Sequence, residues 1–269
     1  MASEMRIATW NVNSLKARLP RVEAWLGYAQ PDVLCLQETK VADAAFPHMA
    51  FHALGYEVAS HGDGRWNGVA IASRIGIEDP VAGFVDRSEE QVVESRLLGA
   101  TCGGLRVVCV YVPNGRRVGT EHYDAKLEWL RDLARHIADT CDPGAEVAVC
   151  GDFNVAPDDR DVWDPAKAHG ATHVSEPERE AVRALLEWGL VDVFRELHPE
   201  PALYSWWDYR AGDFHKHKGM RIDLILLSKR LASQATFAII DRNARKGKLP
   251  SDHAPVFVDI DRIDREAAR

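Results

Sequence analysis

The chain has 269 residues, of which 46% are hydrophobic and 28% are charged, and 33 Lys and Arg face 41 Asp and Glu for a formal net charge of −8. This composition excludes a disordered, collagen-like or coiled-coil protein, and no apolar run approaches the roughly 20 residues of a membrane span. The acidic balance also excludes binding to nucleic acid through overall charge, so DNA contact would require basic residues gathered on one face.

Strand-like and helix-like segments alternate along the chain without a dividing linker, which favours a layered α/β fold in one domain covering residues 1–269. Continuous or alternating apolar runs predict strands at 6–12, 32–37, 69–72, 105–112, 146–150, 203–207, 222–227, 237–240 and 255–260. Helical stripes predict helices from residue 15, with Pro20 in the first turn and Pro31 beyond the end; at 123–137; and from the Ser175–Glu178 capping box to Gly189.

The five cysteines are odd in number and form no C-x-x-C pair. Cys35, Cys109 and Cys150 lie inside apolar runs, so we expect buried, reduced thiols rather than a zinc site or disulfides. The start of the chain lacks a basic segment followed by a long apolar one, which argues against a secretory signal. We therefore expect a cytoplasmic protein, with a monomer as the default state.

Polar side chains stand at the ends of several predicted strands, where α/β sheets build their ligand sites. This convergence predicts a single site assembled from distant parts of the chain. The residues concerned are Asn11, Glu38, Asp152, Asn154, Asp223, Asp252 and His253.

The residue types in this set suggest chemistry. Burying Glu38 behind an apolar strand is costly unless a hard cation compensates its charge. Asp152 and Asn154, two residues apart, share one side of an extended chain. A carboxylate at Asp223 beside His253 would orient the imidazole and favour its protonated form. A solvated strand-end acid, a local Asx turn and a structural histidine remain the respective alternatives.

Eight segments resemble, in order, those of the exonuclease III family of apurinic/apyrimidinic (AP) endonucleases, within the endonuclease/exonuclease/phosphatase superfamily. They span residues 6–260, and the WDYR and GMRID segments favour DNA-repair enzymes over lipid or inositol phosphatases. The resemblance implies a four-layer α/β sandwich, in which two packed mixed β-sheets are flanked by helices. The segments are TWNVNSLKAR, PDVLCLQETK, NGVAIASR, YVPNG, GDFNVAP, YSWWDYR, GMRIDLIL and PSDHAPV.

The resemblance implies a metal site formed by Asn11, Glu38 and Asp252. We expect Mg²⁺ there, with Mn²⁺ as an alternative. A cation held by these oxygens would polarise the phosphate and neutralise its charge.

The resemblance also implies a catalytic set around the phosphate. Asp152 would orient or deprotonate the attacking water, although His253 aided by Asp223 remains the alternative general base. Tyr111, Asn154 and His253 would stabilise the pentacovalent phosphorus.

Six further positions match the family's substrate contacts. Asn114 would lie near the phosphate, Lys126 matches a family lysine, and Asn67 would line the same groove. The family's apolar pocket for a flipped-out abasic sugar falls on Trp206, Met220 and Ile222, with Trp207 pointing the opposite way.

The implied activity is metal-dependent cleavage of duplex DNA 5′ to abasic sites, with additional 3′–5′ exonuclease and 3′-end-cleaning activity. The expected partner is duplex DNA with abasic or 3′-blocked lesions, and no membrane. A hydrolase acting on RNA or another phosphoester, and a non-catalytic DNA-binding relative, remain alternatives. Basic residues cluster at 16–21, 215–221 and 242–248, and we expect the last two of these runs to contact phosphates. The loops 83–96 and 208–221 are expected to set the balance of activities.

Overall fold

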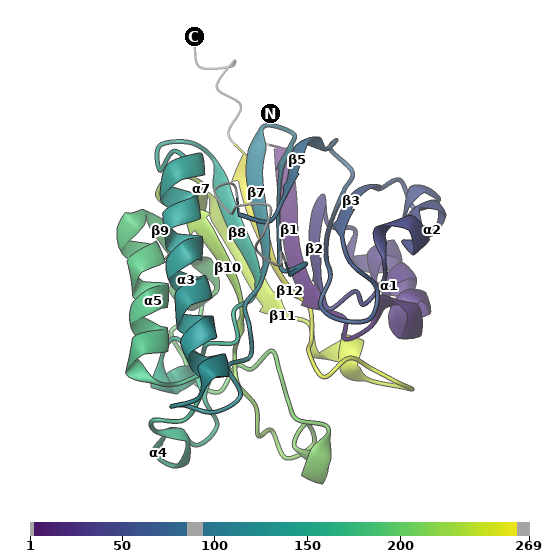
Figure 1. Ribbon diagram of the computed structural model, residues 1–269. Coiled ribbons are helices and arrows are strands. Elements are labelled where there is room, and N and C mark those ends of the chain that lie inside the picture. The colour runs from purple at the N-terminus through teal and green to yellow at the C-terminus, as the bar shows by residue number, and fades with distance from the viewer. Residues whose placement is uncertain (1–2, 85–93, 263–269) are drawn as a thin grey trace.

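The computed structural model describes residues 3–84 and 94–262, in which two six-stranded β-sheets pack face to face with helices on their outer faces (Figure 1). This arrangement confirms the expected four-layer α/β sandwich. No helix in the described ranges is long and apolar enough to cross a membrane. Most of the loop expected at 83–96 falls on residues 85–93, which lie outside the described residues.

The first sheet has the strand order β11-β12-β1-β2-β4-β3. Its central neighbours β1 and β2 run parallel, and its other neighbours pair antiparallel. β2 is buried along its whole length because the second sheet covers one face and helices cover the other. The strands are β1 (Ser3–Asn11), β2 (Val33–Gln37), β3 (Glu57–His61), β4 (Val69–Ser73), β11 (Ala235–Ile240) and β12 (Val256–Arg262).

The second sheet repeats this plan with the order β5-β6-β7-β8-β10-β9. Its central neighbours β7 and β8 run parallel, and the pairs on either side are antiparallel. The strands are β5 (Glu78–Ala82), β6 (Leu97–Cys102), β7 (Leu105–Tyr111), β8 (Val147–Asp152), β9 (Leu190–Asp192) and β10 (Asp223–Ser228).

A helical crossover joins each central parallel pair, because parallel neighbours cannot be linked by a tight turn. α1 (Leu15–Ala29) connects β1 to β2, and α3 (Glu121–Thr140) connects β7 to β8. The carboxyl ends of both pairs meet, since Asn11 at the end of β1 donates a hydrogen bond to Asp152 at the end of β8. Four strand ends from two sheets therefore converge on one place.

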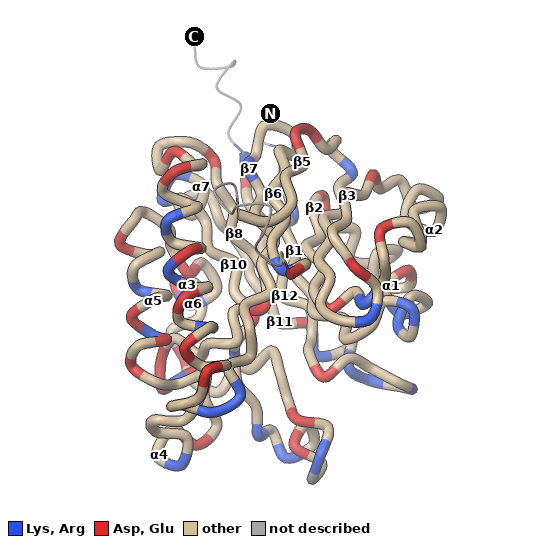
Figure 2. The backbone as a smooth tube through the Cα atoms, in the orientation of Figure 1, with Lys and Arg blue, Asp and Glu red and all other residues tan. Residues whose placement is uncertain are grey.

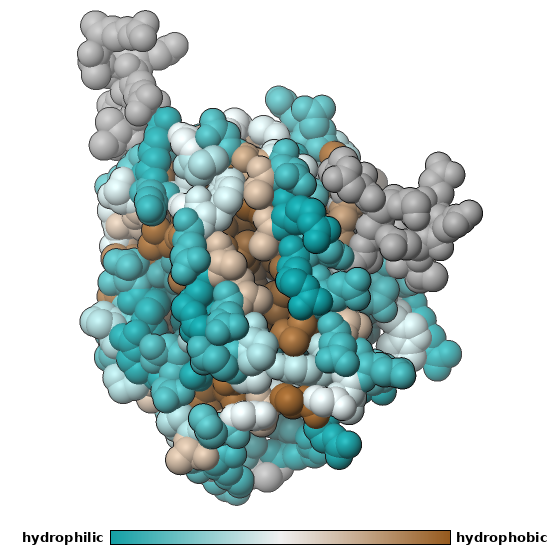
Figure 3. All heavy atoms as spheres, turned by 60° about the vertical axis from the view of Figure 1, so that its left-hand side comes forward, coloured by the Kyte–Doolittle hydropathy of each residue, from teal (hydrophilic) through white to brown (hydrophobic). Residues whose placement is uncertain are grey.

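The core has three apolar layers. One lies between the two sheets, one lies between α1 and the first sheet, and one lies between the second sheet and the helices α3 and α5. Seen from the side of α3 and α5, the surface is largely hydrophilic, and hydrophobic residues show in the furrows (Figure 3). The remaining helices are α2 (His48–His52), α4 (Pro165–Ala168), α5 (Glu176–Trp188), α6 (Val193–Leu197) and α7 (Lys229–Ala232), with 3₁₀ turns η1 (Asp43–Ala45), η2 (Asp159–Asp161), η3 (Arg210–Gly212) and η4 (Arg242–Arg245).

Two predictions about local structure are wrong. Residues 203–207 do not form a strand, because the backbone of Trp206 pairs only as isolated bridges with Met220 and His253. Pro20 lies inside α1 rather than in its first turn, since the helix begins at Leu15. Proline has no backbone N–H, so α1 lacks one internal hydrogen bond there.

Four strands were not predicted: β6, which is apolar and buried, and three others whose sequences explain the omission. β3 and β5 are edge strands, of which β3 is mostly half-buried and β5 exposed throughout, and β9 has three residues. Such short or exposed segments lack the apolar periodicity that identifies a strand. The predicted capping box is confirmed, since the backbone of Ser175 donates to Glu178 at the start of α5. The thiols of Cys35, Cys109 and Cys150 are buried and free, as expected.

Candidate active site

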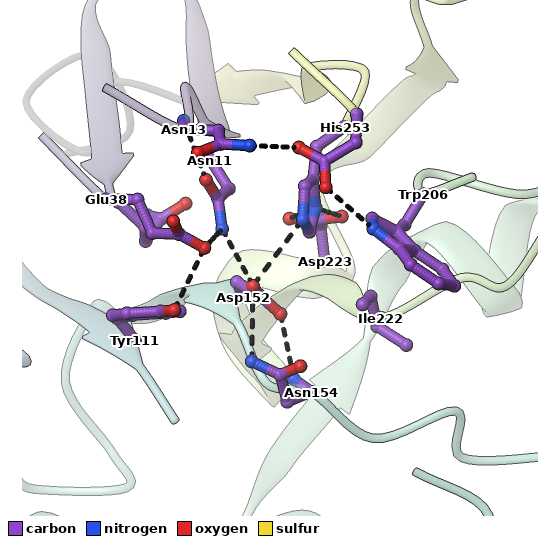
Figure 4. A network of polar contacts seen from close by, with 12 residues as sticks. Asn11, Asn13, Glu38, Tyr111, Asp152, Asn154, Trp206, Ile222, Asp223 and His253 are labelled. Atoms are coloured by element: carbon purple, nitrogen blue, oxygen red, sulfur yellow. Dashed lines mark hydrogen bonds and ion pairs between the residues drawn. The ribbon is translucent and has the colours of Figure 1, made fainter. Parts of the chain in front are cut away.

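A polar network fills the place where the strand ends of both sheets meet (Figure 4). The buried side chain of Asn11 lies at its centre, and its Nδ2 donates to Glu38 Oε1 and to Asp152 Oδ2, both at 2.9 Å. Glu38 follows β2 of the first sheet, and Asp152 ends β8 of the second. One amide group therefore ties together carboxylates from both halves of the molecule.

Glu38 lies in a left-handed backbone conformation (φ 51°), directly after its buried strand. Its Oε1 also accepts a hydrogen bond from the Tyr111 hydroxyl at 2.9 Å, and its Oε2 lies 2.8 Å from Lys40 Nζ. Burial by itself would raise the pKa of Glu38, but hydrogen bonds from Asn11 and Lys40 outweigh it and lower that pKa. Burial and the neighbouring carboxylates of Glu38 and Asp152 raise the pKa of Tyr111, which keeps its proton.

An imidazole lies between two carboxylates on the other side of the site. Asp152 and Asp223 are directly paired across β8 and β10. His253 Nδ1 lies 2.9 Å from Asp223 Oδ2, and its Nε2 lies 3.8 Å from Asp152 Oδ2. Ser205 orients the aspartate by donating its hydroxyl to Asp223 Oδ2 at 2.6 Å.

This geometry determines where protons reside. Both ring nitrogens of His253 face carboxylates, so both are suited to carry hydrogen. Burial would lower the pKa of His253, but the charges of Asp223 and Asp152 raise it to about 10. Burial, helped by the charge of Asp223, raises the pKa of Asp152 to about 7. The site thus holds a cationic imidazole beside a carboxylate that exchanges its proton near neutral pH.

Asn154 is held close to Asp152 by several hydrogen bonds. Its backbone N–H donates to Asp152 Oδ1 at 2.9 Å, and its Nδ2 donates to the Val112 carbonyl at 3.0 Å. Its Oδ1 accepts from Asn114 Nδ2 at 3.2 Å. The two asparagines thus form an amide pair at the edge of the network. Just before Asp152, the backbone of β8 lies very close to that of β7. A Cβ atom at Gly151 would lie 1.9 Å from the Val110 carbonyl oxygen, so only glycine fits there.

The three residues expected to hold a metal are not equally placed. Asn11 and Glu38 are in direct contact, whereas Asp252 is connected to them through Asn13. Asn13 donates to Asp252 Oδ1 at 3.0 Å and accepts from Lys40 Nζ at 2.8 Å. Asn13 was not predicted from the sequence, although its spacing of two residues from Asn11 was a usable signal.

The donor set fits a hard cation. Glu38, Asp252 and Asp152 offer carboxylate oxygens, the ligands that Mg²⁺ and Mn²⁺ prefer. In the described part of the chain, the only three Asp, Glu, His or Cys residues with ligand atoms within 4.8 Å of one another are Asp152, Asp223 and His253, whose imidazole nitrogens are suited to carry hydrogen. The carboxylates of Glu38 and Asp252 are not gathered this closely. Asn11 turns its Nδ2 rather than its oxygen towards Glu38, so its amide would have to rotate to present that oxygen to an ion held by Glu38.

The expected apolar trio lies together beside this network. Trp206, Met220 and Ile222 pack in one small cluster with Val162 and Val174. The Trp206 indole N–H donates to Asp252 Oδ2 at 3.1 Å, and its ring lies 6.5 Å from the imidazole of His253. Trp207 belongs to a different cluster, as its opposite orientation predicts.

Lys126 does not take the position expected of a substrate contact. Its side chain is 0% exposed, and its ammonium is paired with Glu178 and bonded to two backbone carbonyls. It cannot reach a groove from there, so its expected contact with substrate is corrected to a buried structural one. Asn67 lies on the loop next to Glu38, since its carbonyl accepts from the Lys40 backbone N–H at 2.9 Å.

The basic runs are only partly available for DNA. Arg221 is wholly buried between Asp161 and Asp192, so it does not belong to a phosphate-contacting surface. Figure 2 shows other lysines and arginines gathered at the lower end of the molecule, on the loops below the strand ends. The exposed members of the runs are Lys16, Ala17, Pro20, His215, Lys216, Arg242, Asn243, Lys246, Gly247 and Lys248.

Comparison with known proteins gives consistent matches. A family model described as the Endonuclease/Exonuclease/phosphatase family matches residues 8–253. Exodeoxyribonuclease III of Haemophilus influenzae is 33% identical over 268 residues, covering 95% of this chain and 100% of that protein. An AP endonuclease structure from Archaeoglobus fulgidus has a TM-score of 0.92 at 40% identity, covering 96% of this chain and 100% of that one. A 3′ phosphatase from Neisseria, solved with a product DNA hairpin, has a TM-score of 0.92 at 38% identity over the same shares.

Proposed function

Because the chain belongs to the endonuclease/exonuclease/phosphatase family, we propose that it is a metal-dependent DNA-repair phosphodiesterase that cleaves duplex DNA 5′ to abasic sites. It is a hydrolase of the exodeoxyribonuclease III and AP endonuclease type. The products would be a 3′-hydroxyl and a 5′-deoxyribose phosphate. The relatives also support 3′–5′ exonuclease and 3′-end-cleaning activity on the same site.

One observation carries the proposal. The imidazole of His253 is fixed between Asp223 and Asp152, with both ring nitrogens facing carboxylates. An imidazole in this position is better suited to donate hydrogen bonds to a phosphate oxygen than to act as a base. This geometry favours Asp152 as the group that takes a proton from the attacking water, with His253 aided by Asp223 as the alternative base.

The other polar side chains surround the same point. The hydroxyl of Tyr111 and the amides of Asn154 and Asn114 supply neutral donors for phosphate oxygens as negative charge develops. At present the Tyr111 hydroxyl donates to Glu38 and Asn154 Nδ2 donates to the Val112 carbonyl, so these hydrogen bonds would be exchanged for bonds to the phosphate when substrate binds. Asn67, on the loop beside Glu38, would contact the DNA at the edge of the groove.

We assign the cation to Glu38, with Asp252 and a turned Asn11 as further ligands. Mg²⁺ is the expected ion and Mn²⁺ the alternative. When bound, the ion would supply positive charge to the scissile phosphate. Glu38 is suited to this task because its carboxylate stays ionised despite burial.

Substrate selection is assigned to the apolar cluster of Trp206, Met220 and Ile222. A deoxyribose that has lost its base is small and partly apolar, and its extrusion is cheap because no base has to be unstacked. A nucleotide that retains its base requires more room. The indole of Trp206 adjoins Asp252 and His253, which supports a position for the cluster beside the proposed phosphate site.

A 3′ phosphatase is the second candidate function. The specific observation in its favour is the 38% identical Neisseria structure, which is described as a 3′ phosphatase bound to product DNA. A terminal phosphomonoester would occupy the same phosphate position and needs no sugar pocket.

The test is a panel of end-labelled duplexes incubated with Mg²⁺, with Mn²⁺ and with EDTA. The panel contains a central abasic analogue, an undamaged duplex, a 3′-recessed end, a 3′-phosphate end and a matching RNA duplex. Metal-dependent nicking 5′ to the abasic site supports the proposal. Removal of the 3′-phosphate without nicking supports the second candidate, and no turnover on any substrate by folded protein overturns both.

A further inference from the structure

A fully buried ion pair lies behind the active site, outside the catalytic network. Lys126 on α3 and Glu178 on α5 are each 0% exposed and are paired with one another. Removing two charges from water is costly, and such a pair often adds little net stability compared with apolar residues of the same size. The contacts of the two charged groups indicate what else the pair does.

The lysine contacts the backbone of both asparagines that face the phosphate position. Lys126 Nζ donates to the carbonyl of Asn154 at 2.7 Å and to the carbonyl of Asn114 at 3.3 Å. His173 Nδ1 bonds to the same Asn154 carbonyl. Asn154 also lies in a left-handed conformation (φ 50°), which requires support from its surroundings.

The glutamate in turn holds the lysine and the adjoining loop in place. Glu178 accepts hydrogen bonds from the backbone N–H groups of His173 and Ser175, at 3.0 and 3.1 Å. It also accepts from the Thr172 hydroxyl, which donates to the Asn114 carbonyl as well. The start of α5 is thus connected to both asparagines through one carboxylate.

We propose that Lys126 and Glu178 are positioning residues, whose ion pair holds the Asn114 and Asn154 amides at the separation required by the phosphate. This inference rests on the proposed function, because it assigns the two amides to the transition state. The ammonium fixes their backbones from behind while Asn114 Nδ2 donates to Asn154 Oδ1 in front. Loss of the ammonium would free both amides without removing either one.

The experiment uses the full chain and separates positioning from folding. Lys126→Met leaves an unpaired buried carboxylate, so the single variant is expected to lose stability under either explanation. The informative variant is Lys126→Met/Glu178→Gln, because it buries no charge and Gln can still form the capping box of α5. Arg131→Met, on the exposed side of α3, is the matched control.

The double variant is expected to melt above Lys126→Met but below the wild type, because a glutamine at position 178 keeps only one of the two oxygens that accept from the backbone N–H groups of His173 and Ser175. Its kcat on the preferred DNA substrate is expected to stay about tenfold lower, with little change in KM. In an Asn154→Ala background the same double change is expected to have no further effect on kcat, since it acts through that amide. A kcat that recovers with stability, or an undiminished effect in the Asn154→Ala background, overturns the inference. Failure of the wild type to cleave any DNA would instead overturn the proposed function.

Discussion

Asp152 and Asp223 occupy directly opposed positions in the antiparallel pairing of β8 and β10, and both carboxylates are buried. Two like charges so close are unfavourable unless a cation lies between them. The imidazole of His253 meets that requirement, with one nitrogen facing each carboxylate. The pairing of two strands thus determines the protonation of a histidine that comes about thirty residues later in the chain.

Asp223→Asn removes one of the two charges that keep His253 protonated, whereas Asp152→Asn removes the proposed base. We expect Asp152→Asn to lower single-turnover cleavage about 10³-fold or more, and Asp223→Asn to lower it about 10²-fold. Both amide replacements preserve shape, so melting temperatures serve as the folding control. Asp223→Asn cleaving as fast as the wild type would exclude the positioning of His253 from the mechanism.

Glu38→Gln should raise the Mg²⁺ concentration required for half-maximal cleavage about tenfold or more, because a neutral amide is a weaker ligand than a carboxylate. DNA binding measured in EDTA should change much less. Metal titrations of cleavage are the direct measurement. Superimposable titration curves for variant and wild type would remove Glu38 from the ligand set.

Trp206→Ala should reduce abasic-site incision more than 3′–5′ exonuclease activity, since the indole forms part of the proposed sugar pocket. We expect about a tenfold difference between the two losses. Trp188→Ala, at the distant end of α5, is the control for a general loss of packing. Equal losses on both substrates would indicate a packing defect instead of a pocket.

The exposed lysines at the lower end should contribute to DNA affinity through phosphate contacts. Lys246→Ala/Lys248→Ala is expected to weaken binding of undamaged and abasic duplexes alike, and to reduce the slope of log K against log salt by roughly 1 to 2. Fluorescence anisotropy over a range of salt concentrations measures this slope. Lys229→Ala, on α7 at the opposite end, should leave it unchanged.

His173 provides a prediction about stability and pH. Burial, together with the charge of Lys126, lowers its pKa to about 4, below the 6.5 of an unfolded histidine. As the pH falls, the histidine of the unfolded chain therefore takes up a proton before His173 of the folded chain does. The stability that neutral His173 contributes is complete above pH 6.5 and is lost as the pH falls towards 4. The free energy of unfolding should fall by up to about 1 kcal/mol per pH unit across this window.

Urea unfolding of wild type and His173→Asn at several pH values isolates this contribution. The asparagine amide keeps a donor near the Asn154 carbonyl but does not titrate in this range. The stability difference between the two proteins should shrink as the pH falls from 6.5 to 4. A difference independent of pH would contradict the assigned protonation state.

Much of the fold follows from local sequence patterns. The apolar runs at 32–37 and 105–112 form central strands because such runs are stable only when both faces are covered. The polar residues after the runs at 32–37 and 146–150 predicted the convergence of Glu38, Asp152 and Asn154, since strand ends of α/β sheets build their ligand sites.

Other features were decided by tertiary packing alone. Lys126 and Arg221 resemble surface cations in sequence, yet each is fully buried because acidic partners distant in the chain lie opposite it. The protonation of His253 depends on two carboxylates brought together by the register of β8 and β10. The spacing of apolar residues in the sequence shows which side of a helix or strand is apolar. Electrostatic interactions depend instead on the distances between charged groups on different elements. Those distances are set only when the two sheets pack together.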